Sequence, residues 1–259
     1  MTRLSVNLNK IAVLRNSRGG SMPSLLQAAE VVTSAGAHGL TVHPRPDQRH
    51  IRPDDVRALA DWLAEHNAAR SASARVEFNI EGNPFAPAQG SYPGLLALVR
   101  RACPDQVTFV PDSDDQITSD HGFDLSRHHA HLAELVDACR ATGARVSLFV
   151  DTDSKHIAAA AAYGAQRVEL YTGPYATAMQ AGAHALALAH CRAAAAQARD
   201  AGLAVNAGHD LDLRNLPILV EAIPDLAEVS IGHALVNDAL YRGLADATAA
   251  YLVACRAAA

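Results

Sequence analysis

The sequence predicts an α/β protein, a single (β/α)₈ TIM barrel with extra helices that occupies residues 1–259 as one domain. Three observations predict this fold. Strand-like runs recur eight times along the chain, segments with helical spacing lie between them, and no shift in composition marks a second domain. Eight repeats in 259 residues fit a closed barrel better than an open doubly wound sheet, which stays as the alternative.

The strand-like runs are short and rich in β-branched or aromatic residues. They begin, in chain order, at Leu4, Gly39, Arg75, Gln106, Arg145, Arg167, Leu203 and Glu228. Because each connection has room for a helix, we expect parallel strands joined by helical crossovers.

The connections show the start and stop signals of helices. In Arg52–Asn67, Pro53 stands in the first turn, and Asp54 and Asp55 lie near the positive end of the helix dipole. Several other helices are expected to stop at a glycine before the next strand, as in "SAGAHGLTV" and "ATGARVSLFV". No G-x-G-x-x-G follows the first strand, which argues against a dinucleotide-binding fold.

Composition limits the function classes. A chain of this length with 49% hydrophobic residues buries roughly three quarters of its unfolded surface, so one core suffices. The four cysteines are far apart, and we expect reduced core thiols, in helices, in a cytoplasmic protein. Neither a leader segment nor a membrane span is expected. With a net charge of −5 and scattered basic residues, nucleic acid and membrane are not expected partners, and any bound anion is expected to be small.

Polar residues end nearly every predicted strand. In a barrel of this kind the carboxyl ends of the strands and the loops after them build the catalytic face. The residues there are, strand by strand, Asn7, Asn9 and Lys10; His43 and Arg45; Glu81; Asp112 and Thr118; Asp151; Glu169 and Thr172; Asn206 and His209; Gly232 and His233. Their convergence predicts an active site.

Some of these positions have a simpler interpretation. Asp112 and Asp151 are interpreted as helix N-caps or turn formers. The histidines of "RHHAHLAEL", His128, His129 and His131, are expected on the solvated face of a helix, and no metal site is expected there. Glu81 and Glu169 differ, because an unpaired carboxylate in an apolar strand is costly to bury. They must meet basic partners or take part in the chemistry.

The loops suggest two anion sites. Arg45 and His50 follow the second strand, where a guanidinium can bind a phosphate, whereas Arg49 is expected only to cap or solvate the next helix. On the other side, "NAGHD" and "IGHALV" expose backbone N–H groups beside the start of a helix. Two sites imply a pair of phosphorylated substrates or a bisphosphate. His43, Glu81 and His209 would lie between them as acid/base groups.

The motifs together resemble the pyridoxine 5'-phosphate synthase family. They are "VNLNKIAVLRNSRG", "GLTVHPRPDQRHI", "NIEG", "VPDSDDQITSDHGFDL", "VSLFVD", "VELYTG", "VNAGHDL" and "SIGHALV", in the family's order and covering most of the chain. The resemblance implies a homo-octamer of barrels without metal or organic cofactor. It also implies condensation of 1-deoxy-D-xylulose 5-phosphate with 3-amino-2-oxopropyl phosphate to give pyridoxine 5'-phosphate, phosphate and water.

The resemblance also implies roles for individual residues. The family's proton-transfer groups match His43, Glu81 and His209, and Glu169 matches a supporting carboxylate. The ligands of the amino-ketone phosphate match Asn7, Arg18, the backbone after His209, Gly232 and His233. The ligands of the ketose phosphate match Arg45, His50 and Thr118. Closure of the loops after the second and fourth strands would exclude water from the site.

The chain departs from the family pattern in two places. Asn9 and Lys10 stand where the family commonly has Asp-His, so Lys10 offers a cation to a phosphate or hydroxyl. Asp210 stands where glycine usually follows the catalytic histidine, and its carboxylate would repel a phosphate unless it points away. The path from His50 to Glu81 is also long, and an altered loop is expected there.

Two other functions stay open at this point. One is a Schiff-base aldolase on the same barrel, with Lys10 near Arg18 as the nucleophile. The other is a non-catalytic protein that binds phosphorylated metabolites.

Overall fold

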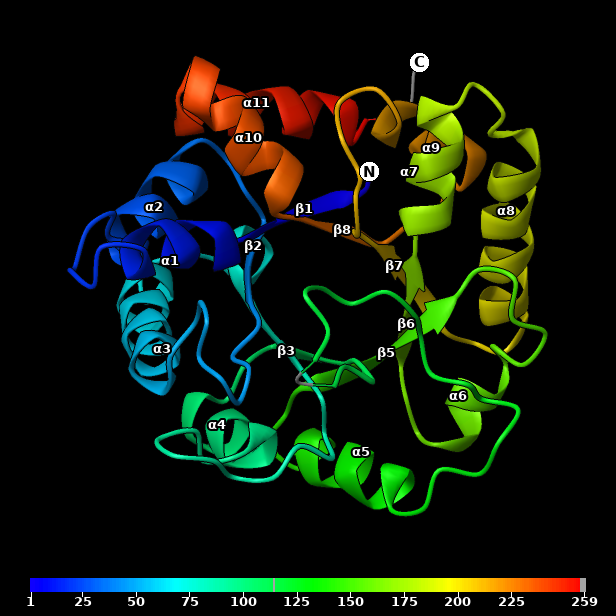
Figure 1. Ribbon diagram of the computed structural model, residues 1–259, viewed down its shortest axis with the longest axis horizontal. Coiled ribbons are helices and arrows are strands. Elements are labelled where there is room, and N and C mark those ends of the chain that lie inside the picture. Colours follow the sequence, from blue (N-terminus) through cyan, green and yellow to red (C-terminus); the bar gives the residue numbers. More distant parts are fainter. Residues whose placement is uncertain (114, 257–259) are drawn as a thin grey trace.

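Eight parallel strands form a closed barrel surrounded by helices in the computed structural model, which describes residues 1–113 and 115–256 (Figure 1). The strands are β1 (Arg3–Asn7), β2 (Gly39–Val42), β3 (Glu77–Gly82), β4 (Gln106–Phe109), β5 (Arg145–Asp151), β6 (Arg167–Tyr171), β7 (Ala204–Ala207) and β8 (Glu228–Ile231). Each strand pairs with the next, and β1 closes the barrel against β8, with Leu4 opposite Val229. The predicted barrel is therefore confirmed.

Helices connect and cover the strands, with more than one helix in several connections. They are α1 (Asn9–Asn16), α2 (Leu25–Ser34), α3 (Pro53–Asn67), α4 (Leu95–Ala102), α5 (Leu132–Arg140), α6 (Ala159–Ala162), α7 (Gly173–Gln180), α8 (Ala185–Asp200), α9 (Leu216–Ala222), α10 (His233–Arg242) and α11 (Leu244–Ala254). Helix α3 begins as predicted, with Pro53 in its first turn and the Asp55 carboxylate accepting from the backbone N–H of Arg52 at 2.8 Å. The predicted extra helices are confirmed.

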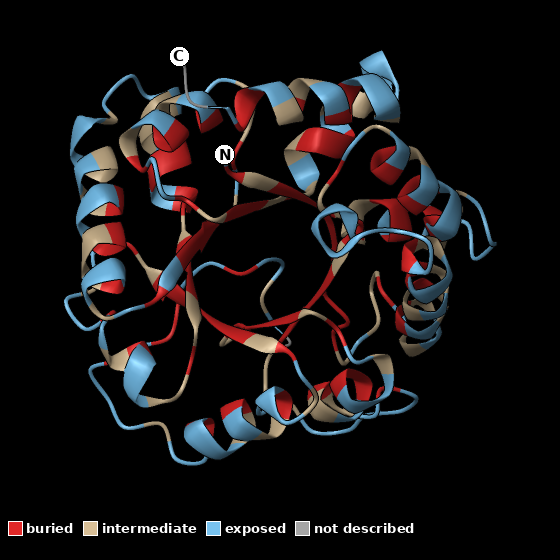
Figure 2. Cartoon of the chain, turned by 180° about the vertical axis from the view of Figure 1, so that it is seen from behind, coloured by how far each residue is buried: buried red, intermediate tan, exposed pale blue. Residues whose placement is uncertain are grey.

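The strands are buried on both of their faces (Figure 2). Leu4, Val6 and Ile80 belong to the hydrophobic core between the barrel and its helices. The alternate residues are polar, and Ser5, Thr41, Asn79 and Thr108 are hydrogen-bonded side chain to side chain across four neighbouring strands. The apolar core therefore lies outside the barrel, and the barrel interior is polar.

Charged side chains close the amino-terminal end of the barrel. Glu77 forms ion pairs with Arg3, at 2.8 Å, and with Arg145. Nearby, Glu228 lies 3.7 Å from Arg167 and accepts a hydrogen bond from Gln106 at 3.2 Å. This network is at the opposite end from the strand ends that the sequence marked as the site.

The prediction of a helix over the histidine cluster is wrong. His128, His129 and His131 all precede α5, which begins at Leu132. His131 has a φ of 63°, a left-handed conformation that an α-helix cannot contain. His131 instead pairs with Glu134 at 2.9 Å. Among the described residues, no group of histidine, cysteine, aspartate or glutamate side chains is arranged to hold a metal ion.

The expectation of four buried cysteines is met in part. The four cysteines are free thiols, and Cys139, Cys191 and Cys255 are buried, but Cys103 is exposed, because it follows the last turn of α4 with a φ of 44°. The long path between His50 and Glu81 includes a short 3₁₀ helix, Ala72–Ala74, after α3. Within the described residues, no helix has both the length and the apolar character needed to span a membrane.

Candidate active site

A cavity of about 450 Å³ opens at the carboxyl ends of the strands. The residues with a predicted catalytic or substrate-binding role line it, except Arg18; these are Asn7, Asn9, Lys10, His43, Arg45, His50, Glu81, Thr118, Glu169, His209, Asp210, Gly232 and His233. Thr172 and Asn206, also among the strand-end residues, do not line it. Arg18 lies in the exposed turn after α1, outside this cavity. Two larger surface hollows, of about 500 and 660 Å³, lie on the helices and take in few of these residues.

His43 and Glu81 face each other near the centre of the cavity. The Nδ1 atom of His43 lies 3.9 Å from Oε2 of Glu81, and both side chains are almost completely buried. Burial, with Arg45 and Arg49 nearby, lowers the pKa of His43 to about 3, so its imidazole is neutral at physiological pH. The contact is therefore a close approach of polar groups and not an ion pair.

Both buried glutamates hold their protons more tightly than a glutamate in water. Burial raises the pKa of Glu81 well above its ordinary value, and the Glu169 and Asp112 charges raise it further. Burial, followed by the charge of Glu228, raises the pKa of Glu169 to about 8. Neutral carboxylic acids at these positions can donate a proton at neutral pH, which an ordinary glutamate cannot.

His209 lies on the loop after β7, among aromatic side chains. Its ring meets Tyr171 edge-on, with ring centroids 5.3 Å apart, and Phe149 at 6.4 Å. The Nε2 atom lies 2.9 Å from the hydroxyl of Thr118, which belongs to the loop after β4. The contact joins two loops from different strands across the cavity.

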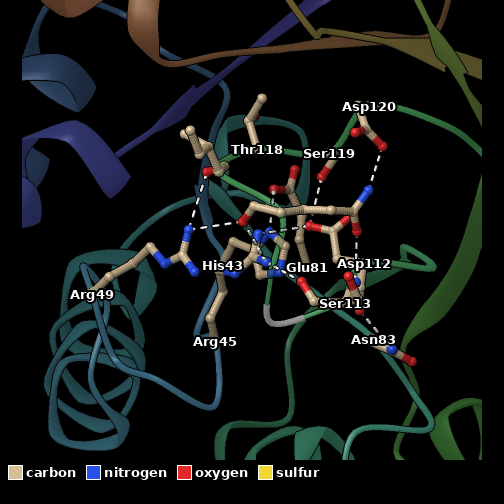
Figure 3. Close-up of polar contacts among 12 residues, drawn as sticks. His43, Arg45, Arg49, Glu81, Asn83, Asp112, Ser113, Thr118, Ser119 and Asp120 are labelled. Atoms are coloured by element: carbon tan, nitrogen blue, oxygen red, sulfur yellow. Dashed lines mark hydrogen bonds and ion pairs between the residues drawn. The ribbon is translucent and has the colours of Figure 1, made fainter.

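Arg45 is held by a buried ion pair that sequence analysis did not foresee (Figure 3). One guanidinium nitrogen donates to Asp112 at 2.9 Å, and another donates to the backbone carbonyls of Ser113, at 2.6 Å, and Gln116, at 3.1 Å. Asp112 also accepts from the hydroxyl of Ser119 at 2.9 Å. Asp112 is therefore no helix cap, and it positions a predicted phosphate ligand.

Arg49 also reaches the cavity, where only a helix-capping role was expected. Its guanidinium donates to the carbonyl of Gln116 at 2.8 Å (Figure 3). It also pairs with Asp47 at 2.5 Å. We define the β4–α5 loop as the described residues 110–113 and 115–131. Arg45 and Arg49, both from the loop after β2, hold this loop, which in Figure 1 lies over the barrel opening.

The first strand and the last loops supply backbone and amide groups. Asn7 donates to Glu81 at 3.3 Å, and Asn9 accepts from the backbone N–H of His43 at 2.9 Å. Gly208 and Gly232 bring the backbone close: a Cβ atom on Gly208 would lie 2.3 Å from the carbonyl oxygen of Ser230. Gly232 precedes α10, so the positive end of that helix faces the cavity.

The whole chain matches one protein family. Residues 4–257 fit the model of the pyridoxal phosphate biosynthesis protein PdxJ. The chain belongs to the PdxJ family. Pyridoxine 5'-phosphate synthase of Xanthomonas axonopodis pv. citri (strain 306) is 58% identical over 251 residues, 97% of this chain and 95% of that protein. The enzyme of the same name from Xylella fastidiosa (strain 9a5c) is 54% identical and covers 97% of this chain and 94% of its own length.

Solved structures of distant proteins share the barrel. Phosphoribosyl anthranilate isomerase from Thermotoga maritima has a TM-score of 0.57 at 12% identity and covers 98% of both chains. Tryptophan synthase from M. tuberculosis, in its aminoacrylate-bound form, has a TM-score of 0.63 at 12% identity over 98% of this chain and 94% of that one. At such identities the likeness shows the fold of a PdxJ protein and nothing of its chemistry.

The cavity wall also contains a cation and an anion that come from different strand ends. Lys10 on α1 and Asp210 after β7 both line the cavity, and the charge of Lys10 acts on Asp210. Asn9 fixes the start of the loop that carries Arg45 and His50, because it accepts a hydrogen bond from the backbone N–H of His43. The cavity wall thus combines the opposite charges of Lys10 and Asp210 with the predicted catalytic groups.

Proposed function

We propose that this chain is a pyridoxine 5'-phosphate synthase that acts in vitamin B6 biosynthesis. It condenses 1-deoxy-D-xylulose 5-phosphate with 3-amino-2-oxopropyl phosphate to give pyridoxine 5'-phosphate, phosphate and water. One observation carries the proposal beyond family membership. A single cavity contains buried acid/base groups in the middle and anion-binding groups on two sides.

The acid/base groups suit a reaction of several proton transfers. The amine of one substrate attacks the ketone of the other, and the imine forms with loss of water. Loss of phosphate and ring closure follow, and each step moves a proton at a different atom. Neutral Glu81 and Glu169 donate protons, while neutral His43, with His209 on the other side, accepts them. Each group contributes roughly 10²- to 10⁴-fold.

The two phosphates bind on opposite sides of these groups. On one side, Arg45, His50 and Thr118 take the ketose phosphate, and the contacts of Arg45 with the β4–α5 loop couple its binding to loop closure. On the other side, Asn7, the backbone at Asp210, Gly232 and His233 take the amino-ketone phosphate at the start of α10. Arg18 was expected on this second side, but it does not line the active-site cavity.

Incubation of the purified protein with both substrates tests the proposal directly. We expect the absorbance of pyridoxine 5'-phosphate to appear together with free phosphate, and only when both substrates are present. Absence of product at every substrate concentration would contradict the proposal and favour a protein that only binds phosphorylated metabolites.

Replacement of Lys10 by alanine separates the synthase from a Schiff-base aldolase. A lysine that forms imines needs an apolar or cationic neighbourhood, whereas Asp210 lies within electrostatic reach of Lys10. We expect Lys10→Ala to keep residual ring synthesis. Complete loss of turnover, with a borohydride-trapped adduct on Lys10 in the unmodified protein, would support the aldolase.

Self-association as a homo-octamer of single-domain chains in the cytoplasm is the remaining part of the proposal. Large apolar side chains stand exposed on α1, α10 and α11, among them Leu14, Leu240, Tyr241 and Val253, and such surfaces commonly mark contacts between protein chains. Light scattering coupled to gel filtration measures the mass. A particle of one chain would contradict this part.

A further inference from the structure

Asp210 adopts a backbone conformation that disfavours most side chains. Its φ is 61°, in the left-handed region, which glycine adopts without steric strain and aspartate adopts at some energetic cost. Its carbonyl oxygen accepts a hydrogen bond from the side chain of Asn215 at 3.1 Å, which holds the turn. The bond to Asn215 uses the backbone of Asp210, so the carboxylate is left for other contacts.

The Asp210 side chain turns back onto the ring of its neighbour. Its Oδ2 atom lies 3.1 Å from Nδ1 of His209. Nδ1 is shielded from solvent and has no aligned hydrogen-bond partner among the described residues, so the contact with the carboxylate is chiefly electrostatic. The opposite ring atom, Nε2, lies beside the hydroxyl of Thr118 at the cavity.

The surroundings keep Asp210 ionised. The contact with His209 lowers its pKa most, and the electrostatic effects of His233 and Lys10 act in the same direction. Lys10 and His233 come from α1 and α10, which follow β1 and β8, the two strands that come next after β7 in the closed barrel. The repulsion that the carboxylate would exert on a phosphate bound near α10 is thereby offset.

We propose that Asp210 is a positioning residue for His209. The carboxylate keeps the ring proton on Nδ1, so Nε2 presents its lone pair to the cavity, and Lys10 balances the added charge. The inference rests on the proposed function, in which His209 transfers protons. Other groups also face the ring, with Tyr171 edge-on from β6 and the charge of Asp112 acting from the end of β4. Neither meets Nδ1 as closely as Asp210 does.

The proton balance of the step is simple. Nε2 takes one proton from a substrate-derived intermediate, and the resulting imidazolium is stabilised by the Asp210 carboxylate, which itself stays ionised. In a later step Nε2 returns that proton to a departing hydroxyl, which leaves as water. The ring ends as it began, neutral with its proton on Nδ1.

Two substitutions separate the carboxylate from the backbone turn. Asp210→Asn removes the charge at nearly constant shape, and Asp210→Gly removes the side chain while favouring the same φ. We expect kcat to fall by roughly ten-fold or more in both variants, with little change in either KM. Asp61→Asn, at an exposed position on α3, is the matched control for loss of one negative charge, and it should leave kcat unchanged.

The ring tautomer is measured independently of turnover. Solid-state NMR of protein labelled with ¹³C,¹⁵N-histidine, with the His209 signals assigned from a His209→Gln variant, should show the Nδ1–H form in the unmodified protein. A shift toward the Nε2–H form is expected in Asp210→Asn and Asp210→Gly. Unchanged tautomer, or kcat in both variants equal to that of Asp61→Asn, would overturn the inference. If the unmodified protein makes no pyridoxine 5'-phosphate, the proposed function fails, while the tautomer still decides the role of Asp210.

Discussion

At the scale of single residues, burial gives ordinary side chains unusual proton affinities. Glu81 and Glu169 keep their protons, and His43 stays without one, because the cavity removes them from water. The same desolvation reduces the stability of the folded chain, since charged forms of these groups are costly to bury. The site therefore trades stability for carboxylic acids that still carry a proton near neutral pH.

Glu81→Gln tests the proton donor at the centre of the site. Glutamine keeps the size of the side chain and its bond to Asn7, but it has no proton to release. We expect kcat to fall by roughly 10²- to 10⁴-fold with the fold intact. Glu65→Gln, at an exposed position on α3, is the control. Loss of a proton-transfer group should cost roughly 10²-fold or more. A kcat within a few-fold of that control would therefore exclude Glu81 as a proton donor.

Glu169→Gln tests the raised pKa of Glu169 through protein stability. Between the ordinary value of 4.5 and about 8, the folded chain keeps a proton that the unfolded chain has lost, so stability falls as pH rises through this range. Glutamine cannot ionise and avoids this loss. We expect the variant to gain roughly 4 kcal/mol relative to the unmodified protein between pH 5 and pH 8.5, because about three pH units of this range lie between the two pKa values and each unit corresponds to about 1.4 kcal/mol. Denaturation curves at both pH values measure it, and an equal difference at the two would contradict the shift.

Most of the site residues were predictable because they stand at or just after the end of a strand, which is a local feature of the sequence. The role of Asp112 was not predicted because the partner, Arg45, is 67 positions away. Local spacing favours a cap for any aspartate after a strand. A usable signal did exist: a buried arginine needs a carboxylate, and Asp112 is the acid that directly follows β4.

At the scale of elements, the β4–α5 loop covers the site and owes its course to a close backbone approach. The backbone N–H of Gly122 donates to the Asp151 carboxylate at 2.9 Å, and a Cβ atom on Gly122 would lie 2.4 Å from the Cα atom of Val150. The loop therefore passes directly over the end of β5. This also explains Asp151, which anchors the loop and was interpreted as a cap or turn former.

Gly122→Ala tests the link between this course and catalysis. Alanine would push the β4–α5 loop off β5 and with it move Thr118 and the carbonyls that Arg45 and Arg49 hold. We expect kcat/KM for the ketose phosphate to fall by at least roughly 10²-fold, since misplacement by about 1 Å has that effect. Gly20→Ala is the control, because nothing lies near its added Cβ atom. Equal kinetics of the two variants would contradict the proposed closure.

Element boundaries were predictable where a period or a stop signal exists. The strands and α3 have both, and they were found close to their places. The start of α5 was not, because the β4–α5 loop contains no apolar period and His131 has a backbone conformation that its residue type does not announce. Only the contacts of the loop with β5 and the β2 loop determine its path.

At the scale of the whole molecule, the barrel separates a site end from a stability end. Alternation along each strand directs apolar residues to the helices and polar residues to the interior. Sequence analysis described the strands as apolar with isolated carboxylates, because it did not separate their two faces. The polar interior continues from the Glu77 and Glu228 network at one end to Glu81 and Glu169 at the other.

Glu77→Gln tests that separation of the two ends. The substitution removes the charge that Arg3 and Arg145 share, and because these arginines are about a third exposed, water replaces part of the loss. We expect destabilisation of roughly 1–3 kcal/mol, below the cost of breaking a fully buried pair, and an unchanged kcat, since the site is at the other end of the barrel. Thermal unfolding and steady-state kinetics measure the two quantities. Asp225→Asn, whose partner Arg199 is half exposed, is the control and should change stability by less than about 1 kcal/mol.

The pH dependence of the stability of Glu77→Gln gives a second check on the same network. Burial alone would raise the pKa of Glu77, but Arg145 and Arg3 outweigh it and lower the pKa below its ordinary value. A carboxyl group whose pKa is lower in the folded chain stabilises that chain when the pH is above the pKa of the group in the unfolded chain. This contribution disappears as the pH falls through the pKa of the group in the folded chain. The stability difference between Glu77→Gln and the unmodified protein should therefore vanish in acid. A stability difference that persists in acid would contradict the charge of Glu77 as its source. A kcat that falls together with stability would show that the network at the base of the barrel reaches the active site.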